Sequence, residues 1–363
     1  MEQLIYPRAL QPGDRVVIVS PSGQVDPAYL AGAQARLASW GLRVEVSPHA
    51  AGGYATFSGT VEERLSDLQS AFDDPTVRAI VCSRGGYGAV HLLERLDFHR
   101  FRRSPKWLVG FSDITALHCL LQSQGFASVH SLMAKHLSID PVGSVGVACL
   151  HAILFGGETG PEGAGTPCGP APETGTIALG QTAGGPTLTY TQPPHALDHA
   201  GHAEGILRGG NLAVSYGLRG TPYDIPPQGT ILFIEDVSEK PHAVERMLYN
   251  LRLAGVLPRL SGLIIGQFTD YEEHHQLGKD LYGAIGDLVA DYHYPIAFDF
   301  PVGHHIPKNL PLIAGARVSL TVDSTHQALT FPLTGPGGDA APAFVPAQQS
   351  TSRPCDAHPQ PQQ

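Results

Sequence analysis

Ser112 lies in the segment Gly110–Asp113 (GFSD), between an apolar run and a segment with helical periodicity. A serine at the turn from a buried strand into a helix is exposed at the sheet edge, beside the positive end of the helix dipole. That is a position for a nucleophile. It is also the position of a helix N-cap, which serine often occupies. Because the spacing is not that of the GxSxG elbow, this segment alone leaves both interpretations open.

A glycine-rich turn, Ser83–Gly88 (SRGGYG), follows another apolar run. Such a turn exposes backbone N–H groups, and adjacent strand ends of a parallel sheet converge on one crevice. These amides can bind an oxyanion or a phosphate. The dinucleotide fingerprint GxGxxG is absent, so a nucleotide site is disfavoured. The alternative is a tight turn in which glycine supplies positive φ and no chemistry.

Two further groups have the types needed for proton transfer. Glu235 and Asp236 end the apolar run TILFIE, and His304 lies in the loop Gly303–Pro307 (GHHIP). Histidine titrates near neutrality, so His304 is a candidate base. The alternatives are a helix cap or solvated strand edge for the acidic pair and a surface position for the histidine.

Two histidine groups have ligand-type side chains close together in the sequence, as a metal site would. Neither group matches HExxH, and both lie in polar or proline-rich segments that are typical of solvent-facing loops. We therefore expect no metal and no other cofactor. The groups are His195, His199 and His202, and Glu272–His275 (EEHH).

Composition excludes several classes of partner. The 363 residues carry a formal charge of −10, which repels phosphate backbones and anionic lipid. We expect no nucleic acid and no membrane contact, since no apolar run approaches the length of a membrane helix and the N-terminus has no signal-type h-region. The 5 scattered cysteines form no CxxC pair, which disfavours a disulfide framework. A cytoplasmic protein is the expectation.

The elements that must position these residues follow from periodicity. Residues 1–150 alternate short β-branched runs with amphipathic stretches, the pattern of βαβ units in a parallel, Rossmann-like (flavodoxin-like) sheet. This predicts an N-terminal α/β domain that carries Ser112. The expected strands are 14–20, 43–46, 77–82, 106–111 and a short one at 128–130, and the expected helices are 31–39, 61–72, 89–96 and one opening at Ser112.

The rest of the chain divides into three parts by composition. Residues 151–204 are rich in glycine and proline and contain no Lys or Arg, which predicts a linker and loop. Residues 205–334 predict a smaller C-terminal α/β domain of the swivelling type that carries Glu235 and His304. Residues 335–363 lack periodicity and predict a disordered tail. The strands expected in the second domain are 230–235, 262–266, 296–298, 316–322 and 328–331, and its helices are 242–254 and 281–290.

Taken together, these segments resemble the LD-carboxypeptidase family of serine peptidases, which includes murein tetrapeptide carboxypeptidases and microcin C self-immunity peptidases. The resemblance runs in order through both predicted domains and leaves out the middle segment and the tail. It rests on Pro12–Gly23 (PGDRVVIVSPSG), Val77–Phe98, Pro105–His118, Gly209–Asp224, Ile231–Leu248, Leu260–Phe268 and Phe300–Leu320.

The resemblance implies a Ser…Glu…His triad of Ser112, Glu235 and His304, formed where the two domains face each other. In such a triad the histidine accepts the hydroxyl proton and the carboxylate fixes the imidazole tautomer. The resemblance also places the oxyanion against the backbone N–H groups of Gly86 and Asp113.

Substrate recognition requires further groups. Release of a terminal residue needs a group that binds a free carboxylate, for which Arg84 is a candidate with a structural ion pair as its alternative. Tyr87 is a second candidate substrate-binding residue. Two segments depart from the family pattern: His130–Met133 (HSLM) replaces HGP, and His305 follows His304, which makes His305 a second candidate base.

The expected activity is hydrolysis of an L,D-amide bond that releases terminal D-Ala from a murein tetrapeptide during peptidoglycan recycling. One alternative is cleavage of microcin C-like peptidyl or aminoacyl adenylates, with Tyr190 or Trp107 stacking on the base. A non-catalytic module that binds cell-wall peptides and a metal-dependent hydrolase are alternatives of other classes. The expected partner is a small peptide, and family members commonly form homodimers.

Overall fold

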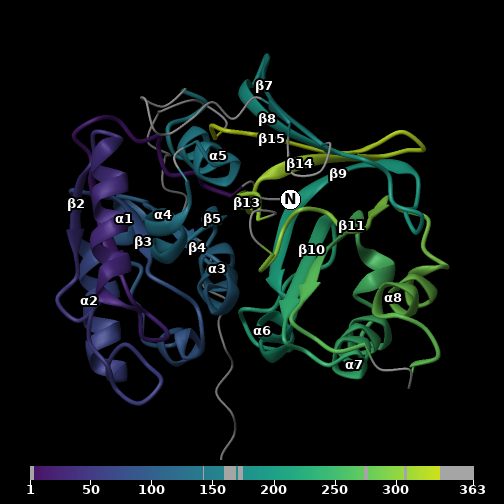
Figure 1. Cartoon of the computed structure of the whole chain (residues 1–363), viewed down its shortest axis with the longest axis horizontal. Helices are drawn as coiled ribbons and strands as arrows, with labels where there is room; N and C mark the ends of the chain where they lie inside the picture. Colours follow the sequence, from purple (N-terminus) through teal and green to yellow (C-terminus); the bar gives the residue numbers. More distant parts are fainter. Residues whose placement is uncertain are drawn as a thin grey trace, which may run out of the picture.

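The chain folds into two lobes, each built around one β-sheet (Figure 1). The computed structural model describes residues 4–141, 143–158, 169–170, 175–273, 277–305 and 309–335. The prediction of a two-domain α/β protein is confirmed. The predicted tail lies, beyond Gly335, outside the described residues. The boundaries at 150, 204 and 334 remain predictions.

The first sheet has six strands in the order β13-β5-β4-β3-β1-β2. Strands β1 to β5 are parallel, and their order 2-1-3-4-5 is that of flavodoxin-like sheets. β13 comes from the C-terminal part of the chain and pairs antiparallel with β5. The bounds are β1 Arg15–Val19, β2 Arg43–Val46, β3 Val77–Cys82, β4 Trp107–Gly110, β5 Ser128–His130 and β13 Leu312–Ala314.

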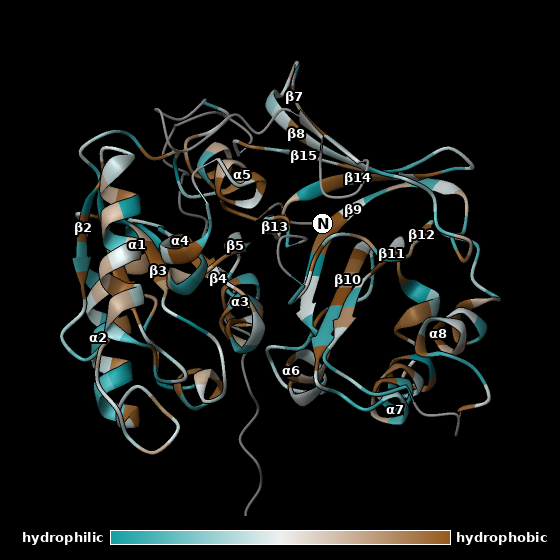
Figure 2. Ribbon diagram, in the orientation of Figure 1, coloured by the Kyte–Doolittle hydropathy of each residue, from teal (hydrophilic) through white to brown (hydrophobic). Residues whose placement is uncertain are grey.

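Apolar side chains cover both faces of this sheet, since successive residues of a strand point to opposite faces. In β1, Val16 and Ile18 enter one apolar cluster while Val17 and Val19 enter another on the opposite face. Figure 2 shows the apolar residues concentrated on the strands and the inward helix faces. The helices of this lobe are α1 Pro27–Ser39, α2 Val61–Asp73, α3 Thr115–Ser123, α4 Ala134–Ile139 and α5 Val145–Leu154, with 3-10 turns η1 Ala89–Leu92, η2 Phe101–Arg103 and η3 Ser112–Ile114.

Local capping sets where two of these helices begin. Asp26 accepts a hydrogen bond from Ala28 N, and Pro27 supplies a preset φ in the first turn of α1. The helix therefore starts four residues before the predicted residue 31. A capping box between Thr60 and Glu63 opens α2 at the predicted position.

The second sheet has nine strands in the order β12-β11-β10-β9-β14-β15-β8-β7-β6. β9 to β12 are parallel, and the remaining strands are antiparallel. The strand bounds are β6 Gly169–Pro170, β7 Thr176–Thr182, β8 Gly185–Gln192, β9 Gly201–Asn211, β10 Thr230–Val237, β11 Gly262–Thr269, β12 Ile296–Ala297, β14 Arg317–Val322 and β15 Gln327–Pro332. The helices are α6 Leu212–Gly217, α7 Pro241–Leu253 and α8 Leu281–Val289, with a 3-10 turn η5 Leu257–Arg259.

The glycine-rich middle segment contains sheet structure that the composition did not predict. β7 and β8 form a hairpin, and residues 187–192 of β8 pair with β15. The hairpin is stable there because Leu188 and Tyr190 alternate inward and are fully buried. Thr187, Thr189 and Thr191 alternate with these residues, so the apolar residues do not form a continuous run in the sequence.

The helix predicted for residues 89–96 is wrong beyond Leu92, since only the 3-10 turn η1 forms there. Val90 is β-branched and Gly88 enters the turn with φ of 119°, so an α-helical ladder is disfavoured. Among the helices that the structure describes, none is long and apolar enough to cross a membrane.

The lobes meet along a seam between α3 and β5 on one side and β9 and β10 on the other (Figure 1). Asn211 N donates to Thr115 Oγ1 at 3.0 Å, and the His130 ring packs edge-on against Phe233 with centroids 5.1 Å apart. The pairing of β13 with β5 adds backbone hydrogen bonds across the same seam. The carboxyl ends of β3, β4 and β10 therefore open onto one region.

Candidate active site

Ser112 occupies a sharp turn directly after β4. Its φ of 63° lies in the left-handed region, which is costly for a residue with a side chain. The N-cap of η3 is Phe111, with no side-chain cap hydrogen bond, so the N-cap interpretation of Ser112 is wrong. The turn is tight because a Cβ on Gly85 would lie 2.8 Å from Ser112 Oγ. A strained serine beyond a strand end is the geometry of an exposed nucleophile.

Glu235 and His304 are hydrogen-bonded to each other. Nδ1 of His304 lies 2.7 Å from Oε2 of Glu235, which is fully buried near the end of β10. The carboxylate holds the proton of a neutral imidazole on Nδ1, so Nε2 is the nitrogen that can accept a further proton. The two residues are 69 positions apart, and the fold brings them together.

The pKa of His304 is raised above its ordinary value of 6.5. Burial opposes the charged ring and is the largest influence. The hydrogen bond to Glu235, the charge of that carboxylate, and the charges of Asp236 and Asp270 favour the imidazolium and together outweigh burial. The site therefore stabilises the protonated ring that forms when His304 takes a proton.

The loop that carries His304 is held by close backbone packing. Gly303 has a φ of 146°, and a Cβ there would lie 3.0 Å from the carbonyl oxygen of Gln267. Across the seam, the His304 ring packs against Phe111 with centroids 4.8 Å apart. Because Phe111 directly precedes Ser112, this contact brings the predicted base against the turn of the predicted nucleophile.

Asp236, which follows Glu235 in β10, is buried and links β10 to the start of α6. Its carboxylate accepts hydrogen bonds from Asn211 Nδ2 at 2.7 Å and from Ala213 N at 2.8 Å. Burial raises its pKa to about 6. The sequence interpretation of this residue as a helix cap or solvated edge was half right, since Asp236 is buried and satisfies an N-terminal amide of α6.

The glycine-rich turn after β3 lies against Ser112. Gly86 is exposed with a φ of 115°, while Gly85 is buried, and a Cβ on Gly85 would lie 3.3 Å from Asp113 N. The predicted oxyanion donors, the N–H groups of Gly86 and Asp113, thus belong to adjoining turns. A nucleophile, a histidine bonded to a carboxylate and a pair of amide-bearing turns are the parts that acyl transfer requires.

Family models match both lobes of the chain. The LD-carboxypeptidase N-terminal domain matches residues 16–131, and the LD-carboxypeptidase C-terminal domain matches residues 204–320. The chain belongs to the LD-carboxypeptidase family. It is therefore a serine peptidase of the LD-carboxypeptidase type, as the sequence predicted.

Individual relatives agree with this membership. A provisionally named carboxypeptidase of Streptomyces coelicolor is 34% identical over 93% of this chain and 100% of its own length. The crystal structure of muramoyltetrapeptide carboxypeptidase from Oxalobacter formigenes is 25% identical, covers 88% of this chain and 98% of its own, and superposes with a TM-score of 0.72. The microcin C7 self immunity protein MccF in complex with aspartyl sulfamoyl adenosine, at 19% identity, shares the fold over 90% of this chain and 98% of its own, with a TM-score of 0.73.

Two candidate substrate residues of this LD-carboxypeptidase lie on the exposed side of the glycine-rich turn. Arg84 is exposed, and its Nη1 donates to the carbonyl oxygen of Gln24 at 2.9 Å. Among the described residues Arg84 forms no ion pair. Tyr87 is 57% exposed and contacts the rings of Phe57 and His91.

His305, the alternative base, is exposed, whereas His304 is the residue that bonds Glu235. The structure therefore favours His304 for this role. The loop histidines considered as metal ligands find other partners: His199 Nδ1 bonds Tyr292 O, and His202 Nδ1 bonds Thr321 Oγ1. No group of three or more metal-type side chains occurs among the described residues, while His274 and His275 lie outside them.

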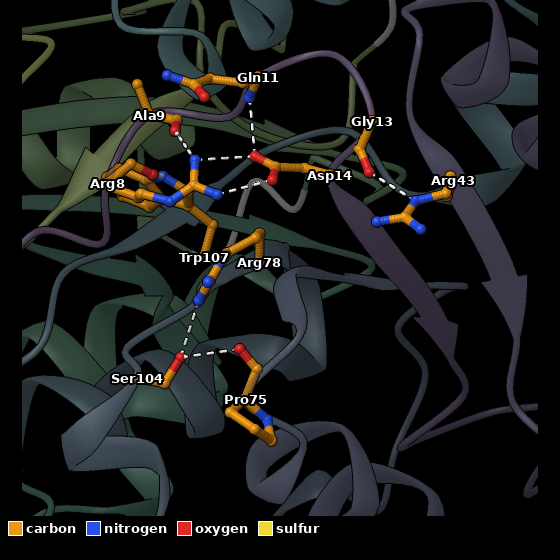
Figure 3. A network of polar contacts seen from close by, with 10 residues as sticks. All are labelled: Arg8, Ala9, Gln11, Gly13, Asp14, Arg43, Pro75, Arg78, Ser104 and Trp107. Atoms are coloured by element: carbon orange, nitrogen blue, oxygen red, sulfur yellow. Dashed lines mark hydrogen bonds and ion pairs between the residues drawn. The ribbon is translucent and has the colours of Figure 1, made fainter.

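Neither aromatic residue proposed to stack on a nucleobase is available for stacking, so those two assignments are wrong. Tyr190 is fully buried, and its hydroxyl donates to Pro311 O at 2.7 Å. Trp107 is 1% exposed at the amino end of β4, and its Nε1 donates to Arg8 O at 3.1 Å (Figure 3). Arg8 in turn forms an ion pair with Asp14, which directly precedes β1. This pair fixes the N-terminal segment at the amino ends of the strands, opposite the carboxyl ends that carry the candidate site.

Sequence reasoning missed a group of buried histidines beside the site. His130 and His136 each pack on Phe111, at 5.9 and 5.7 Å, and His118 bonds Ser128 Oγ and Gly110 O. Burial lowers the pKa of His118 and of His136 to about 4 and that of His130 well below 6.5. These rings are thus neutral near pH 7. His130, which begins the segment where the sequence departs from HGP, is fully buried.

Proposed function

We propose that this protein is a cytoplasmic LD-carboxypeptidase that releases terminal D-Ala from a murein tetrapeptide during peptidoglycan recycling. The observation that carries the proposal is the 2.7 Å hydrogen bond between His304 Nδ1 and the buried carboxylate of Glu235. The same His304 ring packs against Phe111, the residue before Ser112. The name of the Oxalobacter formigenes enzyme supports the substrate class. The proposed triad is Ser112, Glu235 and His304.

The reaction proceeds by acyl transfer to serine. Ser112 Oγ attacks the carbonyl carbon of the L-residue while His304 Nε2 takes the hydroxyl proton, and Glu235 stabilises the imidazolium. The tetrahedral intermediate collapses, the amide C–N bond breaks, and His304 delivers the proton to the leaving amine of D-Ala. Water then attacks the acyl-enzyme with His304 as base, which releases the shortened peptide and regenerates Ser112.

The oxyanion of each tetrahedral intermediate is proposed to accept hydrogen bonds from the N–H groups of Gly86 and Asp113. Preorganised donors of this kind contribute about 3 to 4 kcal/mol each to transition-state stabilisation. Their location in adjoining turns, with Gly85 packed against Ser112, supports this assignment.

Recognition of the free carboxylate of D-Ala is assigned to Arg84. The guanidinium is exposed one residue before the glycine pair, and a planar fork of donors suits a carboxylate. Tyr87, exposed one residue after Gly86, is proposed to contact the peptide. Arg84→Met should raise KM for a peptide with a free C-terminus more than KM for its amide, and equal effects on both would remove Arg84 from this role.

The deciding experiment compares two substrates on the purified protein. One is a murein tetrapeptide that ends in D-Ala, and the other is an aminoacyl sulfamoyl adenylate, with products detected by mass. Release of D-Ala from the first alone supports the proposal. Cleavage of the adenylate alone would replace it with the detoxifying activity, and binding without turnover in both the wild type and Ser112→Ala would favour the non-catalytic module.

Two further parts of the proposal concern the protein in the cell. The location in the cytoplasm is tested by fractionation with marker enzymes. A homodimer, which the family resemblance implies, is tested by sedimentation at several concentrations, and a mass of one chain throughout would contradict it.

A further inference from the structure

Three turns meet at the candidate site, one after each of the strands β1, β3 and β4, and the turn after β3 is the glycine-rich loop. They contain Pro21–Ser22, Gly88–Ala89 and Asp113. Gly23 N donates to Gly85 O at 3.1 Å, which is a direct backbone link between the first two turns. The remaining links are made by two buried charged side chains.

The first is the carboxylate of Asp113, a residue that is only 3% exposed. Its Oδ2 accepts hydrogen bonds from Ser22 Oγ at 2.5 Å and from Ala89 N at 2.8 Å. Oδ2 of Asp113, in the turn that carries Ser112, is thus hydrogen-bonded to both the turn after β1 and the turn after β3. This is a role of the side chain and is separate from that of the Asp113 backbone N–H.

The second is the guanidinium of Arg64 on α2, which is 2% exposed. Its Nη1 donates to Pro21 O at 2.8 Å and to Gly88 O at 2.9 Å, and its Nε donates to Gly59 O at 3.1 Å. The guanidinium also lies over the ring of Phe57, 4.9 Å from its centroid. Arg64 therefore binds the carbonyl groups of the same two turns whose donors Asp113 binds.

The two charges engage consecutive residues. Arg64 donates hydrogen bonds to the carbonyl oxygens of Pro21 and Gly88. Asp113 accepts hydrogen bonds from the hydroxyl of Ser22 and the backbone N–H of Ala89. The contact with Gly88 is close, because a Cβ there would lie 2.9 Å from Arg64 Nη1. Any rotation of the loop at Gly88 would break a bond to each charge at once.

Such a device has a physical purpose. The loop contains Gly85, Gly86 and Gly88, and glycine leaves the backbone many accessible conformations. An oxyanion donor accelerates a reaction only if its N–H already points at the place where charge develops. A buried charge that lost its partners would be strongly disfavoured, so the pair restricts the loop to the conformation in which both charges are satisfied.

We infer that the Asp113 carboxylate and the Arg64 guanidinium are positioning residues that fix the direction of the Gly86 N–H. The inference rests on the proposed function in taking Gly86 as an oxyanion donor. It adds a role for a side chain on α2 and for the acidic residue that follows the nucleophile. Neither side chain contacts the substrate in this scheme.

The test uses four variants of the full chain, namely Asp113→Asn, Asp113→Ala, Ser22→Ala and Arg64→Lys. Asp113→Ala should lower kcat by about 10- to 1,000-fold with KM little changed, the upper bound being outright loss of one oxyanion donor. Asp113→Asn keeps an acceptor oxygen and should recover part of that loss. Ser22→Ala leaves both charges in place and removes one hydrogen bond to Asp113, while Arg64→Lys keeps the positive charge but loses the planar set of donors; both should give smaller losses of kcat.

Asp67→Asn is the matched control. Asp67 is 6% exposed in the same lobe and accepts a hydrogen bond from the backbone of His49, outside the three turns. Asp67→Asn should lower the thermal unfolding midpoint about as much as Asp113→Asn does and should leave kcat unchanged. An equal kcat loss in Asp67→Asn and in Asp113→Asn, or an unchanged kcat in a folded Asp113→Ala, would overturn the inference.

A second readout does not depend on the natural substrate. A fluorophosphonate forms an Oγ–P bond to Ser112 as its P–F bond breaks, and the phosphoryl oxygen of the adduct takes the place of the oxyanion. The labelling rate should fall across the variants in the same order as kcat. If the wild type is labelled but releases no D-Ala, the substrate proposal fails while the labelling rates still decide the inference; a wild type that is not labelled at Ser112 overturns both.

Discussion

The ring of Phe111 packs against the ring of His304 across the seam between the lobes, with centroids 4.8 Å apart and planes tilted by 52°. Phe111 belongs to the nucleophile turn of the first lobe, and His304 to a loop of the second. Glu235 holds the other side of the same imidazole. The histidine is therefore clamped between an apolar ring from one lobe and a carboxylate from the other.

Replacement of Phe111 by leucine should lower kcat by up to about 100-fold, because small misplacements of a catalytic group are costly. Although Phe111 is buried, the free energy of unfolding should fall only modestly, because leucine fills most of the volume of the phenylalanine ring. Phe101→Leu is the control, because Phe101 is fully buried among other phenylalanine rings away from the seam. Steady-state kinetics beside thermal unfolding would decide, and equal kcat values for both variants would contradict the clamp.

The pH dependence follows from the raised pKa of His304. The base must be neutral to accept the serine proton, so kcat/KM should rise with pH through a midpoint above 6.5, the ordinary histidine value. Glu235→Gln removes the carboxylate while burial remains, so the midpoint should move to lower pH and the plateau should fall. A pH–rate profile of both proteins tests this, and a midpoint that rises in the variant would contradict the assigned cause.

The same shift makes a statement about stability. A histidine whose pKa is higher in the folded state binds its proton more tightly there. Its contribution to the free energy of unfolding is therefore fully present below about pH 6.5 and is lost as pH rises through the raised pKa. Denaturant titrations at several pH values should show this slope in the wild type and a smaller one in Glu235→Gln.

How much of this was predictable depended on whether the signal was local. The strands 43–46, 77–82 and 128–130 were predicted at their observed bounds, because β-branched runs bounded by turns carry the signal themselves. The three-residue β13 was missed, since its pairing partner β5 lies far away in the sequence, and β8 was missed because threonines separate its apolar residues. A short strand stabilised by distant pairing leaves little trace in local composition.

The candidate site divides in the same way. Local sequence placed Ser112 at a strand end but left it open between a cap and a nucleophile. The missing cap bond excludes the cap, and Ser112 is the nucleophile that we propose. No local pattern links Glu235 to His304, so the resemblance to a family supplied that pair. The buried links of Asp113 to Ser22 and Ala89 depend on three turns meeting, which periodicity does not reveal.

The strain at Ser112 predicts a trade between stability and activity. A left-handed conformation at a residue with a side chain costs about 1 to 3 kcal/mol, and glycine avoids most of that cost. Ser112→Gly should therefore be about 1 kcal/mol more stable than Ser112→Ala, while both lose hydrolysis. Equilibrium unfolding of the two variants measures this, and equal stabilities would show that the turn is not strained.

Gly85 predicts how tightly the nucleophile turn is packed. An added Cβ would lie 2.7 Å from Ser112 Cβ and 2.8 Å from its Oγ, closer than atoms of side chains approach each other. Gly85 does not have a positive φ, so alanine fits its backbone and the expected effect comes from the contact alone. Gly85→Ala should displace the Ser112 hydroxyl and lower kcat by about 100-fold, with a loss of about 1 to 3 kcal/mol in stability from overpacking.

Gly217→Ala is the matched control for Gly85→Ala, because nothing lies within 4 Å of an added Cβ at Gly217 and its φ is not positive. It should leave kcat and the free energy of unfolding nearly unchanged. The labelling rate of Ser112 by a fluorophosphonate separates displacement from loss of substrate binding, since displacement slows labelling as well as turnover. Normal labelling and turnover in Gly85→Ala would mean that the turn relaxes around the methyl group, and the position of Ser112 would then depend on the bonds of Asp113 more than on packing against Gly85.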